Sequence, residues 1–323
     1  MDLSIIIVNW NSLEYARECI ESIYEYTHGC ELEVIVVDNA SPEGGIDALK
    51  DKWPKITVIK SSENLGFAGA NNLGFDRSCG ETILFLNPDT RLTGPAISTM
   101  FNHLRTLQNA GIVGCKLLNT DLSVQTSCIQ RFPTIFNQLM DIEYLRLWWP
   151  SFPLWRIGPL FSEFVGPVQV EVVSGACTMI KRIVFEKVGK FSEDYFMYAE
   201  DVDLCYQTTL FGFKNYYVGD ATLIHHGGKS TVQKPVSQWS TSMKLRAIMQ
   251  FCIKAHGKSY GILFRIAMGW SACCRLAIIA PARLFLFRGP GKDRAKFASA
   301  KWKAVLNWAF AANSWEAEAL GKR

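Results

Sequence analysis

The sequence lacks any Cys-x-x-Cys pair and any internal repeat, although its 323 residues include ten cysteines. These cysteines are spread from residue 19 to residue 274, and most lie inside apolar segments. A disulfide framework normally belongs to a short secreted chain with regularly spaced cysteines, so this distribution argues against one. It is typical of small buried side chains in a protein of a reducing compartment.

The N-terminus also lacks the basic segment of a signal peptide, because a strand pattern starts at residue 3. We therefore expect a cytoplasmic protein. Charged residues make up only 20% of the chain and hydrophobic residues 49%, a balance that excludes a disordered protein and directs attention to membrane contact. The length allows one large domain or about two ordinary ones.

The few charges are unevenly placed. The net charge is +4, but residues 241–323 contain 15 Lys and Arg against 3 Asp and Glu, which leaves 19 against 27 for residues 1–240. The tail is therefore about +12 and the remainder about −8. Basic, aromatic-rich tails contact nucleic acid or anionic membrane surfaces. Of these two partners we expect the membrane, at the inner face of the plasma membrane, and no nucleic acid.

Apolar runs alternate with helical patterns up to about residue 118, and this order predicts an α/β fold with a mainly parallel sheet. Residues 82–86 form a continuous apolar run, as in a strand buried on both faces. Three such runs end in polar residues: residues 3–8 in Asn9 and Asn11, residues 32–37 in Asp38, and residues 82–86 in Asn87 and Asp89. In open α/β sheets the carboxyl ends of the strands form the ligand site, so we expect these side chains to meet there.

The rest of the chain departs from this alternation. Residues 120–166 are irregular and rich in Trp and Pro, which is typical of a lid or binding loop. Residues 260–288 are apolar but contain four arginines, so we do not predict a membrane-spanning helix there. Beyond them, Ala298, Trp302, Val305, Leu306 and Ala309 share one helical face. That face fits either an interfacial membrane helix or a helix packed on a core.

Seven short motifs occur in one order along residues 1–235. They are Val8-Asn9-Trp10-Asn11, Val37-Asp38-Asn39, Asn64 to Asn72, Asn87-Pro88-Asp89, Ser174-Gly175-Ala176, Glu200-Asp201 and His225-His226-Gly227-Gly228-Lys229-Ser230. In this order they resemble the family 2 glycosyltransferases of the GT-A fold, and in particular the rhamnosyltransferase-like branch of bacterial cell-surface polysaccharide synthesis. The resemblance implies a catalytic domain at 1–237, with a nucleotide-sugar half at about 1–118 and an acceptor half at about 119–237. A basic helical tail would occupy 238–323.

The resemblance also implies where a nucleotide-sugar donor binds. Asp38 would accept hydrogen bonds from the base or the ribose; the alternative is a turn or cap aspartate. The two glycines between Asn64 and Asn72 would let backbone N–H groups approach the donor phosphates, unless they merely form a tight turn. The expected donor-binding residues are Asn9, Asn11, Asp38, Asn64, Gly66, Gly69, Asn72, Asn87, Asp89 and Gly175.

Asp89 is the candidate ligand for Mg²⁺ or Mn²⁺, since a divalent cation on the diphosphate disperses the charge of the leaving group. The usual Asp-x-Asp pattern is altered here, because Asn87 occupies its first acidic position. In the resemblance a histidine completes the metal site. His225 fits the His-x-x-Gly-x-Ser spacing best, with His226 as the second choice and a histidine pair simply packed in a loop as the alternative.

The pair Glu200 and Asp201 is expected to act on the acceptor. A sugar hydroxyl is a weak nucleophile, and in the family the aspartate of the Glu-Asp motif, here Asp201, removes its proton. The alternative is an acidic cluster on the surface. We therefore predict an inverting transferase that moves a sugar, best L-rhamnose from dTDP-L-rhamnose, to a glycan or a polyprenyl-diphosphate-linked saccharide.

Two other functions compete with this prediction. A nucleotidyltransferase would have a Gly-rich, Lys- or Arg-bearing loop after the first strand, where this chain has Asn9-Trp10-Asn11. A non-catalytic nucleotide-sugar-binding protein would not need Asp89, Asp201 and His225 together.

Overall fold

The computed structural model describes residues 1–141, 149, 152, 155–164, 166–227, 238–285 and 290–311. The chain forms two compact units. The larger unit comprises Met1–Phe132, Leu145–Phe196 and Glu200–Gln233, and the smaller comprises Pro133–Tyr144, Met197–Ala199 and Lys234–Arg323. The boundary predicted between 237 and 238 adjoins residues 228–237, which lie outside the described residues, as do Gly228, Lys229 and Ser230 of the last motif.

The first four strands of the larger unit form a parallel sheet in the order β3-β2-β1-β4. They are β1 (Leu3–Asn9), β2 (Leu32–Asp38), β3 (Thr57–Lys60) and β4 (Thr82–Leu86), and the intervening helices are α1 (Leu13–Tyr26), η1 (Ile46–Ala48), α2 (Leu49–Lys52) and α3 (Gly66–Phe75). Every residue of β4 is buried, as the continuous apolar run predicts. The alternation of strands and helices is therefore confirmed for this part of the chain.

The other half of the sheet is mixed. β10 (Cys177–Lys181) lies between β4 and β6 (Ala110–Leu118) and runs antiparallel to both. β11 (Lys214–His225) runs parallel to β6 and antiparallel to β5 (Thr90–Leu92) and β8 (Pro167–Val170). The α/β class is confirmed, but the parallel arrangement holds for the first four strands and not for the whole sheet. Strand β10 is the reason, because it enters the centre of the sheet from late in the chain.

Residues 167–173 form two strands in different sheets. β8 pairs with β11, whereas β9 (Val172–Val173) pairs with β7 (Ile129–Gln130) in a separate two-stranded sheet. Glu171 lies between them and its carboxylate accepts a hydrogen bond from the N–H of Phe132 at 2.8 Å. The chain thus changes sheets at a residue whose side chain is anchored to the neighbouring segment.

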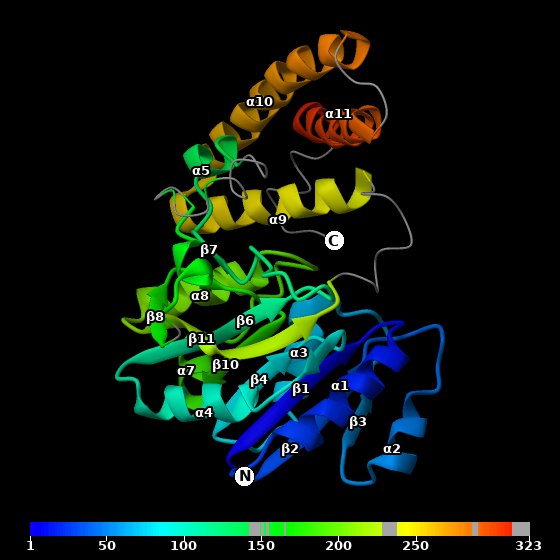
Figure 1. Cartoon of the computed structure of the whole chain (residues 1–323), viewed down its shortest axis with the longest axis vertical. Helices are drawn as coiled ribbons and strands as arrows, with labels where there is room; N and C mark the ends of the chain where they lie inside the picture. Colours follow the sequence, from blue (N-terminus) through cyan, green and yellow to red (C-terminus); the bar gives the residue numbers. More distant parts are fainter. Residues whose placement is uncertain are drawn as a thin grey trace. The chain divides into compact units, whose positions relative to one another are not determined.

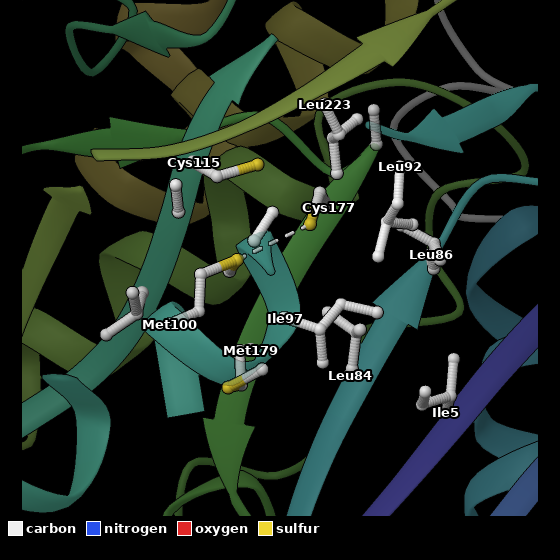
Figure 2. Close-up of a cluster of buried hydrophobic side chains, with 14 of the residues drawn as sticks. Ile5, Leu84, Leu86, Leu92, Ile97, Met100, Cys115, Cys177, Met179 and Leu223 are labelled. Carbon is white, nitrogen blue, oxygen red and sulfur yellow. Dashed lines mark hydrogen bonds between the residues drawn. The ribbon is translucent and has the colours of Figure 1, made fainter. Parts of the chain in front are cut away.

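Helices cover both faces of the large sheet (Figure 1). α1 and α4 (Ala96–Thr106) pack on one face, and Figure 2 shows Ile97 and Met100 of α4 among Leu84, Leu86 and Met179 of the strands. α3, α7 (Arg182–Lys187) and α8 (Glu200–Leu210) contribute to the other face. Successive side chains of a strand point to opposite faces, so Ile5 and Ile7 join the first layer while Ile6 faces α3 at Gly74.

Four phenylalanines fill the second face. The ring of Phe85 lies 4.9 Å from that of Phe185 and 4.8 Å from that of Phe191, and Phe75 lies 4.8 Å from Phe185 between ring centroids. These tilted and edge-to-face contacts are the preferred geometry of aromatic pairs. They join β4 and α3 to the segment after α7, which leads towards α8.

The smaller unit is helical. It contains α5 (Ile135–Leu139), α9 (Gln238–His256), α10 (Lys258–Phe285) and α11 (Pro290–Phe310). Within α11, Val305 and Ala309 are buried, with only 2% and 6% of their surface exposed. Of the two interpretations of this helix, packing on a core is therefore the one that the structure supports. The described part of the irregular segment 120–166 contains β7, α5 and η2 (Gly158–Phe161), and its role as a lid stays a prediction.

Candidate active site

The ends of β1 and β2 bring Asn9 and Asp38 side by side, because these residues are paired in the parallel register. Asn9 Nδ2 donates to Asp38 Oδ1 at 3.2 Å and to the hydroxyl of Ser41 at 3.1 Å. The same hydroxyl accepts from the backbone N–H of Asn11 at 3.1 Å. Ser12 precedes the first residue of α1, and its hydroxyl donates to Asn9 Oδ1 and does not cap the helix. This network fixes the carboxylate of Asp38 at the edge of the sheet.

The loop before α3 is organised by Asn39, a residue for which the sequence predicted no role. Its amide donates to Asn64 Oδ1 at 3.0 Å and to the carbonyl of Gly66 at 3.1 Å, and it accepts from the N–H of Leu65 at 2.8 Å. The N–H of Gly66 donates to Asn64 Oδ1, and that of Phe67 donates to the carbonyl of Phe196. Acceptors within the chain therefore already bind the N–H groups of Leu65, Gly66 and Phe67, and contact of this segment with the donor phosphates stays a prediction.

The glycines of this loop have steric reasons to be there. Gly66 has a φ of 72°, and a Cβ on it would collide with the backbone carbonyl of Phe196. A Cβ on Gly69 would lie 3.1 Å from that of Leu65. Asn72 Nδ2 donates to the carbonyl of Phe191 at 2.9 Å, and its Oδ1 accepts from the N–H of the same residue at 3.2 Å. The Asn64 to Asn72 segment therefore ties the end of α7 to α3.

Asp89 and His225 meet at the ends of β4 and β11. Asp89 is 4% exposed, and its Oδ1 lies 3.3 Å from His225 Nε2. Asn87 Nδ2 lies 3.4 Å from the same nitrogen. The antiparallel pairing of β5 with β11 brings them together, since Thr90 lies opposite His225 and the N–H of His226 donates to the carbonyl of Asp89. The predicted pair is thus adjacent in space although 136 positions separate it.

Gln125 determines how the His225 ring is oriented. Its Nε2 donates to the backbone carbonyl of His225 at 2.6 Å, so its Oε1 faces His225 Nδ1, at 2.9 Å. Because a carboxamide oxygen can only accept, we assign the proton of the neutral ring to Nδ1. The lone pair is then on Nε2 and points towards Asp89. Metal-binding histidines are held by a second partner in this manner.

The pair of Asp89 and His225 suits a divalent cation. A carboxylate oxygen and an imidazole lone pair converge on one place, with the amide of Asn87 beside them. The described residues contain no group of three or more His, Cys, Asp or Glu that could hold a metal by themselves. The arrangement therefore fits an ion whose remaining ligands come from the donor diphosphate and water.

His226 is oriented differently. Its ring lies 5.5 Å from that of Tyr15 in α1, between centroids, and both ring nitrogens are buried with no hydrogen-bond partner among the described residues. Of the two histidines, His225 is the one that faces Asp89.

Asp201 lies in the first turn of α8, where its carboxylate is held by two backbone donors. The N–H of Gly175 donates to its Oδ2 at 2.9 Å, and the N–H of Val202 donates to its Oδ1 at 2.8 Å. A Cβ on Gly175 would lie 3.1 Å from that of Asp201, so this glycine permits the close approach. Gly175, predicted to contact the donor, is placed against the candidate base.

Glu200 is 7% exposed, and its Oε2 has no hydrogen-bond partner among the described residues. Burial, and secondarily the nearby charge of Asp201, raises the pKa of Glu200 from 4.5 to about 8. At neutral pH Glu200 therefore holds its proton and leaves one negative charge on the pair. The two preceding residues, Tyr198 and Ala199, have φ values of 71° and 61°. Such strain in non-glycine residues is concentrated at functional sites.

A short backbone connection links the base to the candidate metal site. The N–H of Asn87 donates to the carbonyl of Ala176 at 2.9 Å, and the preceding residue, Gly175, binds Asp201. Leu86 of β4 lies opposite Cys177 of β10. The antiparallel strand β10 thus places the two acidic groups at the same edge of the sheet.

The described part of the chain also has a hollow at the other edge of the sheet, around Asp2, Glu81, Arg105, Lys181 and Arg182. Acidic and basic side chains alternate in it, and none of the predicted site residues lines it.

The family model of "Glycosyl transferase family 2" matches residues 4–189, more than half of the chain. The protein therefore belongs to this family, and it is a glycosyltransferase. An N-acetylglucosaminyl-diphospho-decaprenol L-rhamnosyltransferase of Mycobacterium tuberculosis is 29% identical to it over 226 residues, which cover 66% of this chain and 72% of that protein. Rhamnosyltransferase WbbL of Escherichia coli is 26% identical over 229 residues, 69% of this chain and 82% of its own.

Among solved structures, the mannosyltransferase PcManGT from Pyrobaculum calidifontis in complex with GDP-Man and Mn²⁺ matches with a TM-score of 0.61 and 17% identity. The match covers 97% of this chain and 87% of that one. At this identity the likeness shows the fold alone, which is GT-A.

Proposed function

We propose that the enzyme transfers L-rhamnose from dTDP-L-rhamnose to a saccharide carried on a polyprenyl diphosphate, with inversion at the anomeric carbon. Two relatives named as L-rhamnosyltransferase and rhamnosyltransferase support the donor, and the first of these names includes a diphospho-decaprenol acceptor. Transfer of the sugar to such a lipid-linked acceptor would take place at the cytoplasmic face of the plasma membrane.

One observation supports this chemistry above all: Asp89 with His225, and Asp201 with Gly175, occupy neighbouring strand ends that Asn87 and Ala176 connect. In the proposed reaction the acceptor hydroxyl gives its proton to the Asp201 carboxylate as its oxygen bonds to C1 of the sugar. The bond between C1 and the diphosphate oxygen breaks on the opposite face. A positioned base of this kind typically contributes about 10²- to 10⁴-fold.

Asp89 and His225 would hold a Mg²⁺ or Mn²⁺ ion, which when bound disperses the negative charge that develops on the leaving diphosphate. Asn87 stands where a second carboxylate is usual, so this chain brings one negative charge fewer to the ion. The orientation of His225 by Gln125 offsets part of that loss by keeping the lone pair on Nε2 aimed at the site.

The nucleotide would bind where Asn9 and Asp38 meet. Asp38 is 7% exposed, and its Oδ1 accepts a hydrogen bond from Asn9. Its other carboxylate oxygen can accept a hydrogen bond from the base or from a ribose hydroxyl while the bond to Asn9 is kept. The two loops around this part of the site would be fixed by the remaining predicted residues, which are Asn11, Asn64, Gly66, Gly69 and Asn72. Protonated Glu200 would keep Asp201 as the single charge of the acidic pair.

A panel of nucleotide sugars tests the donor. We expect saturable binding and transfer with dTDP-L-rhamnose, and weaker binding with nucleotide sugars of other hexoses. The Asp201→Asn variant is the matched control, because it should bind the same donor without transferring it. Tighter binding of a different nucleotide sugar would refute the assignment to rhamnose while leaving the transferase chemistry in place.

A further inference from the structure

Arg265 and Arg275, two of the arginines that interrupt the apolar run of α10, point into the smaller unit. Arg265 is 0% exposed and donates to the carbonyls of Trp308, Ala309 and Ala311 at the end of α11, at 2.8 to 3.0 Å. Arg275 donates to the carbonyl of Leu139 at 2.7 Å, and its guanidinium lies 4.3 Å from the centre of the Trp302 ring. The charges of these two arginines therefore serve the packing of the helix, and cation–π contact and carbonyl acceptors compensate their burial.

The opposite side of α10 is apolar and exposed. Its large side chains have exposed fractions of 44% to 72% and recur at helical spacing: Ile262, Leu263, Ile266, Trp270 and Ile278. Cys273 and Cys274 are exposed within the same stretch. Between Ile262 and Ile278 the only charged residues are the two arginines that point inward. We call this surface, from Ile262 to Ile278, the outer face of α10.

α10 is also the one described helix that is long and apolar enough to cross a membrane, over Lys258–Ala280. Only 28% of the most apolar stretch of this segment is buried. Its contacts argue against a spanning orientation. Gly269 approaches Ala309 of α11, and Gly261 packs against Ile253 of α9. One side of α10 is therefore packed against two neighbouring helices. A helix with one packed side and one bare apolar side is suited to lie in the plane of an interface.

The positive charge of the tail indicates which partner would cover the outer face of α10. Residues 241–323 carry about +12, and Lys258, Lys301 and Lys303 are exposed. Two copies of so basic a segment repel each other, which disfavours a dimer through this face. An anionic bilayer offers both hydrocarbon for the apolar side chains and phosphate for the lysines.

We propose that the outer face of α10 docks the enzyme on an anionic lipid bilayer, with Trp270 and its apolar neighbours below the headgroups. The surface differs from the one that the sequence suggested, since Val305 and Ala309 of the apolar face of α11 are buried within the unit. The inference extends the proposed function, on which its biological meaning rests, by naming the surface that would contact a membrane carrying a lipid-linked acceptor.

Vesicle binding by the full-length protein tests this surface without donor or acceptor, so the result is independent of the sugar specificity. The vesicles are phosphatidylcholine with or without phosphatidylglycerol. The variant Ile266→Ser/Trp270→Ser should sediment with the anionic vesicles at least about tenfold less than wild type, since each lost side chain removes roughly tenfold or more of partitioning. The control Ile183→Ser changes a side chain that is 72% exposed in the larger unit and should bind like wild type.

A second measurement locates the contact. Lipids brominated in the acyl chains should quench the fluorescence of the wild type more than that of Trp270→Phe. Equal sedimentation of the double variant and wild type would overturn the proposal, and so would equal quenching. A dimer in lipid-free buffer that the double variant abolishes would identify a second copy as the occupant. Resistance of the protein to alkaline extraction from the membrane would indicate a spanning helix. Either of these last two results would also refute the docking proposal.

Discussion

Replacing Gln125 with leucine tests whether the His225 ring must be held for metal binding. The change removes two hydrogen bonds, one of 2.6 Å to the His225 carbonyl and one of 2.9 Å at Nδ1. Without them the ring can turn or move its proton to Nε2, the nitrogen that faces Asp89. Loss of such a supporting partner typically weakens metal binding by 10- to 100-fold, or about 1.4 to 2.8 kcal/mol.

The backbone around Gln125 should survive the substitution. Its N–H donates to the carbonyl of Leu117 and its carbonyl accepts from the N–H of Cys128, and neither bond involves the side chain. We therefore expect a folded variant with an unfolding temperature close to that of wild type. The affinity for Mn²⁺ is the measured quantity, by titration in the presence of a nucleoside diphosphate, with free Mn²⁺ followed by electron paramagnetic resonance.

Two companion variants separate orientation from general damage. Gln125→Glu keeps an acceptor at Nδ1 and should retain most of the Mn²⁺ affinity. Asn119→Leu removes an exposed hydrogen bond to Ser123 in the same loop and should leave the affinity unchanged. A folded Gln125→Leu protein with wild-type Mn²⁺ affinity would show that His225 is not held for a metal.

Three further predictions concern the carboxylates. Asp201→Asn should leave donor binding nearly intact and lower transfer about 10²- to 10⁴-fold; a variant with more than about a tenth of wild-type turnover would contradict its role as base. Chelation of divalent ions, and Asp89→Ala, should each weaken donor binding measured by calorimetry, whereas full activity in EDTA would rule out a metal at Asp89. For Glu200, the raised pKa of about 8 means that the folded state keeps a proton that the unfolded state releases above its pKa of 4.5. The contribution of this proton to the free energy of unfolding is complete below pH 4.5 and is lost as the pH rises through 8. The free energy of unfolding of Glu200→Gln should therefore increase relative to that of wild type from pH 5 to 8, by up to about 1.4 kcal/mol per pH unit. A stability difference that does not change with pH in denaturant titrations would argue against a proton on Glu200.

Sequence patterns were sufficient for the first half of the fold because its strands and helices alternate along the chain in recognisable patterns. Each buried strand from β1 to β4 is an apolar run, and each is followed by a helical pattern, so the order of elements implies the parallel pairing. The same logic failed for β10, which is five residues long and has no distinguishing pattern. Its position between β4 and β6 depends on pairings with residues 64 to 99 positions away, and periodicity carries no information about those.

The candidate site, like the fold, was predicted only where its residues belong to a recognisable pattern in the sequence. Asp89, Asp201 and His225 belong to motifs, whereas Gln125, which orients the His225 ring, does not. Gln125 lies in an irregular segment without a motif, and Asn39 and Ser41 look like ordinary turn residues. Their roles come from hydrogen bonds to residues 26 to 100 positions away, which only the folded chain brings within reach.

By itself the sequence determined the family, the strands that end in polar residues, and the uneven charge of the two parts, since each of these depends on residue type and order along the chain. Only the tertiary structure decided which side of each element meets another. It turned Arg265 and Arg275 of α10 inward and left an apolar face outside, buried Val305 and Ala309 of α11, and directed the loop N–H groups before α3 to acceptors within the chain. A helical pattern shows that a face is apolar, but what covers that face is determined by packing between segments far apart in the chain.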